Sequence, residues 1–403
     1  MNAALIFWLC IAMVAYAYAG YPLLVALLAR YRGSTPLRQG LTLESAPSKI
    51  TPLECIAADS NAGNDTHWPP PLTVVVAACN EEARIAGRVR DVLAQDYPAD
   101  RLWVHVVSDG STDRTAQAAD IGDPRVTVRS LPGNVGKAAA LNAALTGVDT
   151  GLVAFTDARQ RFAPGALRHL VAAFADPAVG GISGELMIAP HAHDPRLESV
   201  GLYWRMEKSL RANEARLGWL HGVSGSIHAL RRELFRPLPA GTVLDDMWLP
   251  LQVLLGGHRI WMERDAIAWD SPSGQPREEF QRKLRTLAGN WQLLARLPVL
   301  IHPSRNPVFF AWFSHKFLRL LVPWALLMAL VASALAPGPL YRGLFLAQLL
   351  AYAWAIAGLR LPRLAARIPL LPTAGTFLML NLAALLALPV SLAWQPSQLW
   401  KKH

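Results

Sequence analysis

The 403-residue chain is 52% hydrophobic and 17% charged, which is apolar for a purely soluble protein and enough for one large domain or two modest ones. Its formal net charge of +10 suits an anionic membrane surface, an anionic substrate or nucleic acid. Its basic residues do not interleave with aromatic ones in a stripe, so we expect no nucleic acid partner. The cysteines Cys10, Cys55 and Cys79 lack metal-ligand spacing, and we expect free thiols in a reducing compartment.

Apolar stretches at both ends of the chain predict membrane-spanning helices. They cover about residues 3–29, 320–336, 344–359 and 373–394. A helix of about 20 apolar residues crosses the hydrocarbon core of a bilayer. The first stretch has no charge. It is too long for a signal peptide and lacks the basic start of one, so we interpret it as a retained anchor. The two middle stretches are short for full spans, which leaves a re-entrant pair as an alternative.

Basic residues at the ends of these stretches predict the orientation in the membrane. Arg30 and Arg32 follow the first stretch, so the positive-inside rule places residues 33–300 in the cytoplasm. The basic loop around Arg363, between the third and fourth stretches, then also falls on the cytoplasmic side. The two C-terminal lysines fall on the outside, in mild conflict with the rule.

Residues 33–71 are rich in Ser, Thr, Pro, Asn and Gly without an apolar period, so we expect a flexible linker. Apolar β-branched runs then alternate with segments of helical spacing. The expected strands are 72–78, 102–107, 126–129, 152–155 and 179–186, and the expected helices are 85–93, 112–119, 137–145 and 165–174. This alternation predicts an α/β domain over about residues 72–280, with a mostly parallel sheet whose loops lie along one edge.

The second half of this block has a less regular pattern. We expect a long amphipathic helix at 197–217, a Gly- and Ser-punctuated segment at 222–230, a helix at 246–255 and a strand at 258–262. The apolar residues on one face of the next helix are Leu284, Leu287, Trp291 and Leu294. Together with the basic residues before them, they predict amphipathic interface helices over 281–316, followed by a transmembrane region over 317–403.

Polar residues follow the first two expected strands. Asn80 and Glu81 come after the first; Asn80 can cap the next helix, and a carboxylate there can accept a hydrogen bond from a hydroxylated ligand. Asp109 and Gly110 come after the second, where Gly110 permits a tight turn and Asp109 can accept from a base N–H. Each motif alone is equally well a capped turn, but two of them at one sheet edge favour a ligand site.

A basic and an acidic residue follow later in the same domain. Lys137 ends a glycine-containing turn and starts a helix, an arrangement that can seat an anion, although the full phosphate-loop spacing is missing. Asp157 ends the fourth strand and can bind a divalent ion that bridges two phosphates. The alternative for Asp157 is a structural ion pair with Arg159.

Asp245 and Asp246 are adjacent acids after a Pro- and Gly-containing turn. Side chains of adjacent residues point in different directions, so we expect only one of the two to face the site. A carboxylate there can take a proton from an attacking hydroxyl; the alternative is an acid pair at a helix N-terminus. The histidines His191, His193, His221 and His228 are scattered, and we expect core or surface roles for them rather than a metal site.

Taken in order, these motifs resemble the membrane-bound, processive-type glycosyltransferases of family 2. That group includes the synthases of cellulose, chitin, hyaluronan and poly-N-acetylglucosamine, and the pattern is also close to that of ceramide glucosyltransferases. The resemblance covers about residues 72–324 and rests on five ordered motifs, so it specifies the superfamily but not the sugar. It implies a GT-A fold inserted between transmembrane helices, and an inverting transfer from a nucleotide diphosphate-sugar. The donor that it implies first is a UDP-sugar.

The resemblance also assigns roles to residues of this chain. It implies that Asp157, as the first acid of an Asp-x-Asp motif, binds Mg²⁺ or Mn²⁺ with the diphosphate, and that Asp246 is the catalytic base. Residues 222–226 would line the acceptor end. The residues implied to bind the donor nucleotide are Ala78, Asn80, Glu81 and Asp109 for the nucleoside, and Lys137, Arg282 and Arg285 for the diphosphate.

Two departures from the family pattern leave points open. Arg159 replaces the second acid of Asp-x-Asp, which opens the question of the metal geometry. In the Gln-x-x-Arg-Trp motif Arg285 is kept, but Arg282 stands for Gln and Thr286 for Trp. The missing Trp would stack on an acceptor sugar, so its loss leaves long-polymer synthesis open.

We therefore expect an integral protein of a bacterial inner membrane that transfers sugar to a growing polysaccharide or to a lipid-linked acceptor. The first alternative is an enzyme that adds one sugar to a lipid such as ceramide or a polyprenyl phosphate. The second is a non-catalytic membrane receptor for a nucleotide. Four spans are few for a self-contained channel, so a homo-oligomer or an export partner could complete one.

Overall fold

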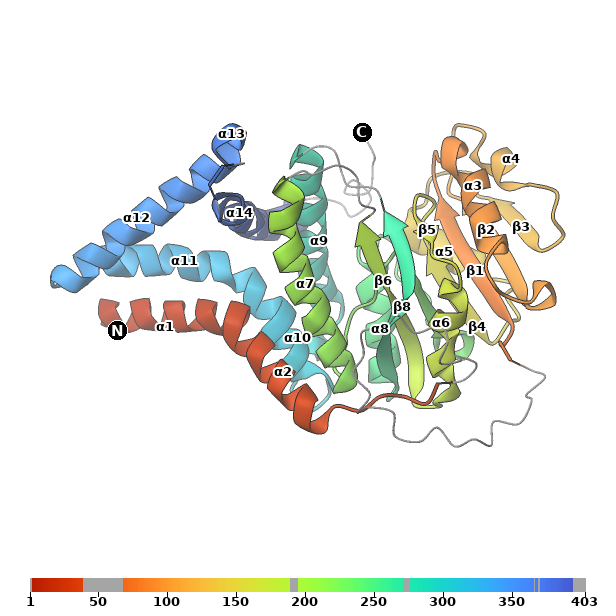
Figure 1. The fold of residues 1–403 in the computed structure, drawn as a ribbon, viewed down its shortest axis with the longest axis horizontal. Coiled ribbons are helices and arrows are strands. Elements are labelled where there is room, and N and C mark those ends of the chain that lie inside the picture. Colours follow the sequence, from red (N-terminus) through yellow and green to blue (C-terminus); the bar gives the residue numbers. More distant parts are fainter. Residues whose placement is uncertain are drawn as a thin grey trace.

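The computed structural model of the chain describes residues 2–38, 68–188, 195–270, 276–365, 367–368 and 370–393. An α/β domain lies at one end of the molecule and a group of long apolar helices at the other (Figure 1). Two helices, α7 (Pro195–Arg216) and α9 (Pro276–Arg296), lie between them. Most of the expected linker falls outside the described residues.

The sheet contains eight described strands in the order β3-β2-β1-β4-β7-β6-β8-β5. Their bounds are β1 Leu72–Ala78, β2 Leu102–Ser108, β3 Val126–Ser130, β4 Leu152–Thr156, β5 Arg161–Phe162, β6 Val179–Ile188, β7 His228–Arg231 and β8 Arg259–Asp270. The central strand β1 is a continuous apolar run because both of its faces are covered, and Val74, Val75 and Val76 are all fully buried.

The sheet is mixed. The pairs β1–β2, β1–β4, β2–β3 and β6–β8 are parallel, whereas β4–β7, β6–β7 and β5–β8 are antiparallel. All five strands expected up to residue 186 are present, but the sequence analysis missed the two-residue β5 and the central β7. The reason is clearest for β7. This strand has only four residues and follows a Gly- and Ser-rich segment without an apolar period. It lies between β4 and β6 and joins the two parallel parts into one sheet.

Helices of the domain cover the sheet. They are α3 Glu82–Leu93, α4 Thr115–Ala119, α5 Lys137–Ala144, α6 Ala166–Ala172 and α8 Asp245–Leu255. In α3 the apolar residues Ile85, Val89 and Val92 recur at helical spacing and are fully buried against the strands. The same pattern had predicted this helix, and its register sets where the preceding loop, with Asn80 and Glu81, meets the sheet edge.

Four apolar helical segments have the length and composition to cross a bilayer: Ala3–Arg32, Phe309–Leu335, Pro339–Arg360 and Leu371–Ala393. At 1.5 Å per residue, the shortest of them is roughly 33 Å long. The second and third are longer than the apolar stretches that the sequence analysis expected, because Lys316 and Arg342 interrupt the apolar pattern without interrupting the helices. A re-entrant pair is therefore not needed.

These segments are made of named elements in Figure 1. The first joins α1 (Ala3–Ala15), the π-helical η1 (Tyr16–Gly20) and α2 (Tyr21–Arg32). The second joins α10 (Phe309–Trp312), the π-helical η7 (Phe313–Phe317) and α11 (Leu318–Leu335). The third is α12 (Pro339–Arg360) and the fourth is α14 (Leu371–Ala393), with α13 (Pro362–Ala365) between them. Helix α1 lies along α11 and α9 packs against α14, so the expected interface helix is held between the domain and the apolar helices.

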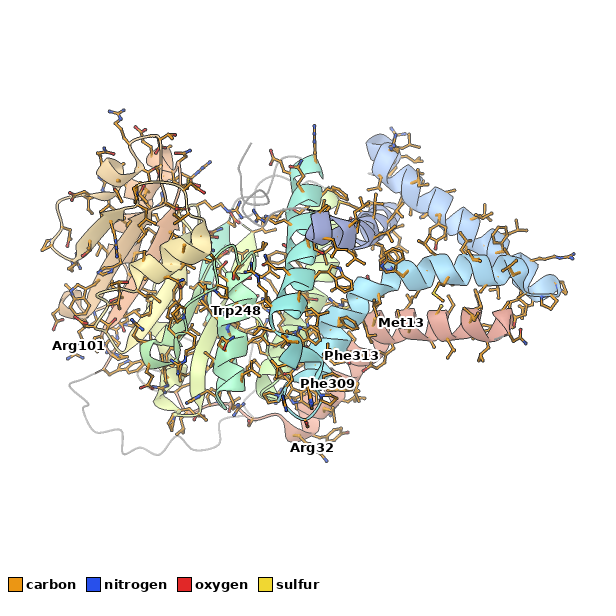
Figure 2. The ribbon with its side chains drawn as sticks, turned by 180° about the vertical axis from the view of Figure 1, so that it is seen from behind. Met13, Arg32, Arg101, Trp248, Phe309 and Phe313 are labelled. Atoms are coloured by element: carbon orange, nitrogen blue, oxygen red, sulfur yellow. The ribbon has the colours of Figure 1, made fainter. Side chains whose placement is uncertain are left out.

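The outer surfaces of these helices are apolar. Side chains project outward along them in Figure 2, where Met13 marks the first segment and Phe309 and Phe313 mark the start of the second. The exposed large apolar residues here include Leu9, Leu23, Leu27, Val331, Leu346 and Leu350. A continuous apolar surface of this kind is typical of a membrane-contacting region.

Candidate active site

The loops after β1 and β2 hold each other at the edge of the sheet. Asn80, with a positive φ of 54°, accepts through Oδ1 from the backbone N–H of Thr112 at 2.9 Å. The backbone N–H of Glu81 donates to Thr115 Oγ1 at 2.8 Å. Asn80 thus does not cap α3, as the sequence analysis had suggested, but ties its loop to the neighbouring one. The buried Ala78 contributes its carbonyl oxygen, which accepts from the N–H of Asp109 at 2.8 Å.

Asp109 anchors the turn that leads to Lys137. Its two carboxylate oxygens accept from the backbone N–H groups of Val135 and Gly136 at 2.8 and 2.9 Å. Gly110 has a φ of +58°, and a Cβ there would lie 2.2 Å from the backbone nitrogen of Asn134, so the close approach of the two loops requires glycine. The sequence analysis expected the backbone N–H groups of this loop to bind an anion. Two of them instead donate to the Asp109 carboxylate, and the positive charge of the loop comes from Lys137.

Lys137 and three acids form the centre of the site. The Nζ atom of Lys137 lies 3.1 Å from Oδ1 of Asp157 and 3.1 Å from Oδ2 of Asp245. Burial alone would lower the pKa of Lys137, but the charges of Asp157, Asp245 and Asp246 raise it above its ordinary value. Burial alone would raise the pKa of Asp157, yet Lys137 holds it below its ordinary value. At neutral pH the centre is therefore an ammonium among carboxylates.

Asp246 has a different environment from its neighbour. Burial, followed by the nearby charge of Asp245, raises the pKa of Asp246 to about 6. A Cβ built on Gly225 would lie 3.6 Å from Oδ2 of Asp246, and the backbone N–H of Val223 donates to the carbonyl oxygen of Asp246 at 2.9 Å. The segment 222–226 therefore lies directly against this carboxylate, and Gly225 leaves it uncovered.

Asp245 also belongs to the site, although the sequence analysis expected only one acid of the pair to face it. The two side chains do diverge, since Asp245 contacts Lys137 and Asp246 faces Gly225. Although the two side chains point in different directions, both carboxylates act on Lys137. Both acids also start α8, where a negative charge is favourable, as the alternative of an acid pair at a helix N-terminus predicted.

Arginines complete the electrostatics. Burial lowers the pKa of Arg285 on α9, while the charges of Asp157 and Asp246 oppose this effect, which places its guanidinium within electrostatic reach of the acids. Arg282 instead pairs with Glu279 on its own helix. Arg159 pairs with Asp270 at 2.8 Å, whereas Asp157 pairs with Lys137. The Asp157–Arg159 pair considered as an alternative is thus not the ion pair that forms.

The sequence analysis did not identify three residues that hold parts of the site in place: Arg88, Thr156 and Arg211. Arg88 is fully buried on α3 and donates to Thr156 Oγ1 at 2.8 Å, and Thr156 donates to the carbonyl oxygen of Ser226 at 2.7 Å. These bonds fix the end of β4 and the segment 222–226 together, beside Asp157. His228 stacks on Phe155 with ring centroids 4.9 Å apart, as a core residue.

Arg211, on α7, is the third of these residues. It donates to the carbonyl oxygen of Gly222 at 3.2 Å and to Ser183 Oγ at 3.1 Å. A single half-buried arginine on a helix gives no period or motif that a sequence reading could detect; its partners Ser183 and Gly222 come from other segments of the chain.

A cavity of about 310 Å³ is lined by Ser224, in the segment 222–226 that lies against Asp246. It begins near Ser224 and Arg211 and reaches Leu380 and Ala384 of α14, between the domain and the apolar helices. Its lining is rich in cations: Lys208, Arg211, Lys283, Lys316 and Arg319. A space that runs from Ser224 to the apolar helices is suited to a molecule with one polar and one apolar end.

Comparison with known sequences identifies the domain. Residues 73–238 match the sequence model of Glycosyl transferase family 2. The chain carries a family 2 glycosyltransferase domain.

Relatives of this glycosyltransferase domain carry several activities. An N-acetylglucosaminyltransferase of Rhizobium sp. is 29% identical over 241 residues, which cover 56% of this chain and 52% of the relative. A beta-monoglucosyldiacylglycerol synthase of Synechocystis sp. is 30% identical over 204 residues, which cover 49% of this chain and 40% of the relative. The chain spans about half the length of the curated relatives it matches.

A solved structure agrees with the fold of the family 2 domain and its helices. A mannosyltransferase from Pyrobaculum calidifontis, in complex with GDP-Man and Mn²⁺, matches with a TM-score of 0.66 at 24% identity and covers 96% of this chain and 99% of its own. The fold is therefore GT-A-like, with one apolar segment before the domain and three after it, as the sequence analysis expected.

The donors at the centre of the glycosyltransferase domain fit a divalent metal. Mg²⁺ typically takes one or two carboxylates together with phosphate oxygens and water. The Asp157 side chain is 37% exposed at the end of β4, and Lys137 Nζ already occupies a cation position beside it. Arg159 stands where the second acid would be and pairs with Asp270, so this position offers no carboxylate to an ion. Asp157 with the phosphates of a donor could therefore hold the ion.

Proposed function

We propose that this protein is an inverting glycosyltransferase that moves a sugar from a nucleotide diphosphate-sugar to an acceptor reaching the site from the membrane side. The observation that carries the proposal is the meeting of Asp157, Lys137 and Asp246 at the edge of a family 2 domain. Asp246 abuts the segment 222–226 through Gly225.

In the proposed reaction Asp246 accepts the proton of an acceptor hydroxyl. The freed oxygen bonds to the anomeric carbon from one face while the bond from that carbon to the diphosphate oxygen breaks on the other, so the configuration inverts. One carboxylate on the acceptor side is sufficient for this course. A raised pKa suits Asp246 to this role, because a base works best when its pKa is near the working pH.

The donor would bind along the opposite loops. Asn80, Glu81 and Asp109 lie at the ends of β1 and β2, where nucleosides bind in open α/β sheets. Lys137 and Arg285 would face the negative charge that develops on the leaving diphosphate. A Mg²⁺ or Mn²⁺ ion at Asp157 would add Lewis-acid charge to the same phosphates. A UDP-sugar is the first donor to test.

The cavity favours a lipid-linked acceptor over a free sugar. It joins the neighbourhood of Asp246 to α11 and α14, so a lipid tail could stay among the apolar helices while the polar head reaches Ser224. Addition of one sugar to a lipid and extension of a lipid-linked chain both use this path. Mass spectrometry of the product formed in membranes distinguishes them, because a single addition gives one mass increment and extension gives a series.

A nucleotide-release assay tests the proposed function itself. Purified protein in lipid is incubated with a panel of sugar nucleotides, with and without a membrane lipid extract. Release of nucleoside diphosphate that depends on both components supports transfer. Binding of a nucleotide without turnover under any condition would instead support the alternative of a non-catalytic receptor.

The acid limb of the pH profile should lie near pH 6. Because burial and Asp245 raise the pKa of Asp246 to about 6, the carboxylate gains a proton as the pH falls through that value. We expect kcat/KM to fall by about tenfold per pH unit below it. The Asp245→Asn variant lacks the neighbouring charge, so its limb should move to lower pH. A flat profile between about pH 5 and 8 would contradict the assignment of Asp246 as the base.

The domain should face the cytoplasm of an inner membrane. We expect a cysteine at position 363 to react with an impermeant thiol reagent only after permeabilisation, in a background without the three native cysteines. Arg342→Cys, at the other end of α12, is the matched control and should react in intact cells. Labelling of Arg363→Cys from outside intact cells would reverse this topology.

A further inference from the structure

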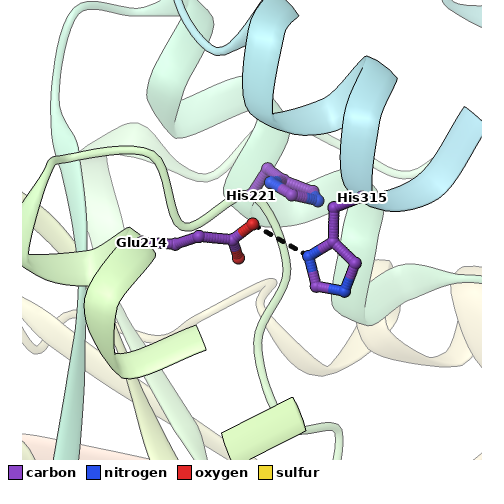
Figure 3. A group of neighbouring side chains, drawn as sticks. All are labelled: Glu214, His221 and His315. Atoms are coloured by element: carbon purple, nitrogen blue, oxygen red, sulfur yellow. Dashed lines mark hydrogen bonds and ion pairs between the residues drawn. The ribbon is translucent and has the colours of Figure 1, made fainter. Parts of the chain in front are cut away.

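Two histidines and a glutamate that are far apart in the sequence meet where the domain joins the apolar helices (Figure 3). Glu214 lies near the end of α7, His221 in the segment that follows, and His315 in the π-helical turn η7. One ligand atom of each lies within 4.8 Å of the others. The three residues are 0%, 1% and 1% exposed, so the cluster is buried.

The hydrogen bonds around both rings are those of metal-binding histidines. Nδ1 of His221 lies 3.0 Å from the carbonyl oxygen of Trp219, which can only accept, so this nitrogen carries the proton and Nε2 does not. Nε2 of His315 lies 2.7 Å from Oε1 of Glu207. Metal-bound histidines commonly donate their second nitrogen to a carbonyl or a carboxylate in this way, which fixes the ring.

Two buried atoms of the cluster have no hydrogen-bond partner among the described residues. They are Nε2 of His221 and Oε2 of Glu214. Buried polar atoms without partners are rare, and here both belong to potential ligands. Glu214 Oε1 is already engaged, by the hydroxyl of Tyr21 at 2.7 Å and by Nδ1 of His315 at 2.9 Å.

We propose that His221 Nε2, His315 Nδ1 and a carboxylate oxygen of Glu214 form a Zn²⁺ site. Two imidazoles and one carboxylate are a donor set that Zn²⁺ accepts, with a water completing four ligands. Mg²⁺ prefers oxygen donors, which separates this site from the ion expected at Asp157. Tetrahedral ligands about 2.0–2.1 Å from zinc lie roughly 3.4 Å apart, so small side-chain rotations close the cluster. Binding releases the proton that now joins His315 to Glu214.

The location of the site indicates that a bound metal would hold two parts of the molecule in a fixed relation. His221 directly precedes the segment 222–226, which lies against Asp246, and η7 is part of the second apolar segment. A metal held by both would fix the acceptor end of the active site relative to the membrane. A second described group, His169, Glu263 and Asp265, offers less, because Arg38 already pairs with Glu263 at 2.6 Å.

Metal content tests the proposal without an activity measurement. The full chain is purified in detergent, stripped with a chelator, reloaded with zinc and analysed by mass spectrometry of the metal. We expect about one Zn²⁺ per chain and a higher thermal midpoint after loading. His221→Gln and Glu214→Gln should lose both the zinc and the shift. The Asp157→Asn variant and the exposed control His302→Gln should keep them.

Glu207→Gln provides a test that does not depend on removing a ligand. It keeps a side chain that can accept from His315 but removes the carboxylate charge, and such changes typically weaken metal affinity by about 10–100-fold. This variant decides the matter if the ligand variants do not fold. Substoichiometric zinc without a thermal shift in the wild type, or unchanged zinc affinity in Glu207→Gln, would overturn the proposal.

Discussion

Asp246→Asn is expected to lower sugar transfer by about 10²–10⁴-fold, the usual contribution of a positioned proton acceptor. Donor binding should stay nearly unchanged, because Asp246 lies against Gly225 and the segment 222–226 rather than against the nucleotide loops. Donor affinity by calorimetry and single-turnover transfer separate the two effects. The substitution keeps the size of the side chain and removes only its ability to take a proton.

Asp245→Asn is the matched control. It should cost less in transfer than Asp246→Asn, because the carboxylate of Asp245 contacts Lys137 and not the acceptor segment. Its effect should appear mainly in donor binding, because the Lys137 ammonium loses one of the two carboxylates that hold it in place. The opposite ranking would move the base to Asp245. Wild-type turnover in both variants, with the nucleotide still bound, would favour the receptor alternative.

Asp157→Asn is expected to weaken donor binding and turnover together, with a loss in kcat/KM of about 10²–10³-fold. An ion held by Asp157 would supply positive charge to the diphosphate in both ground and transition states, so both parameters should change. The variant also removes one of the two carboxylates that hold Lys137 at 3.1 Å. The measurement is kcat and KM for the donor across a titration of Mn²⁺ and Mg²⁺.

Asp120→Asn, an exposed acid outside the site, controls for loss of charge. If activity resisted both EDTA and Asp157→Asn, no metal would act here. Stabilisation of the negative charge on the leaving diphosphate would then depend on Lys137 and Arg285, because Arg159 is paired with Asp270.

Much of the fold was predictable because its signals are local. The apolar runs that became β1 and β4 are buried on both faces, and the 3.6-residue period of Ile85, Val89 and Val92 marked α3. The apolar segments at both ends were equally clear from length and hydropathy. Strand β7 was not predictable, because four residues after a glycine-rich segment carry no period and are made a strand by their neighbours β4 and β6.

The sequence by itself determined which residue types stand at the carboxyl ends of the strands, because parallel strands bring those ends to one edge. That placed Asp109 and Asp157 at the site, and the order of motifs added Asp246. Their partners were decided only by tertiary structure. Asp109 binds loop amides, and Lys137 reaches Asp245 across more than 100 residues. Ion pairs between distant segments depend on three-dimensional distance and burial, which no local pattern records. For the same reason the meeting of His221 with His315 was invisible in the sequence.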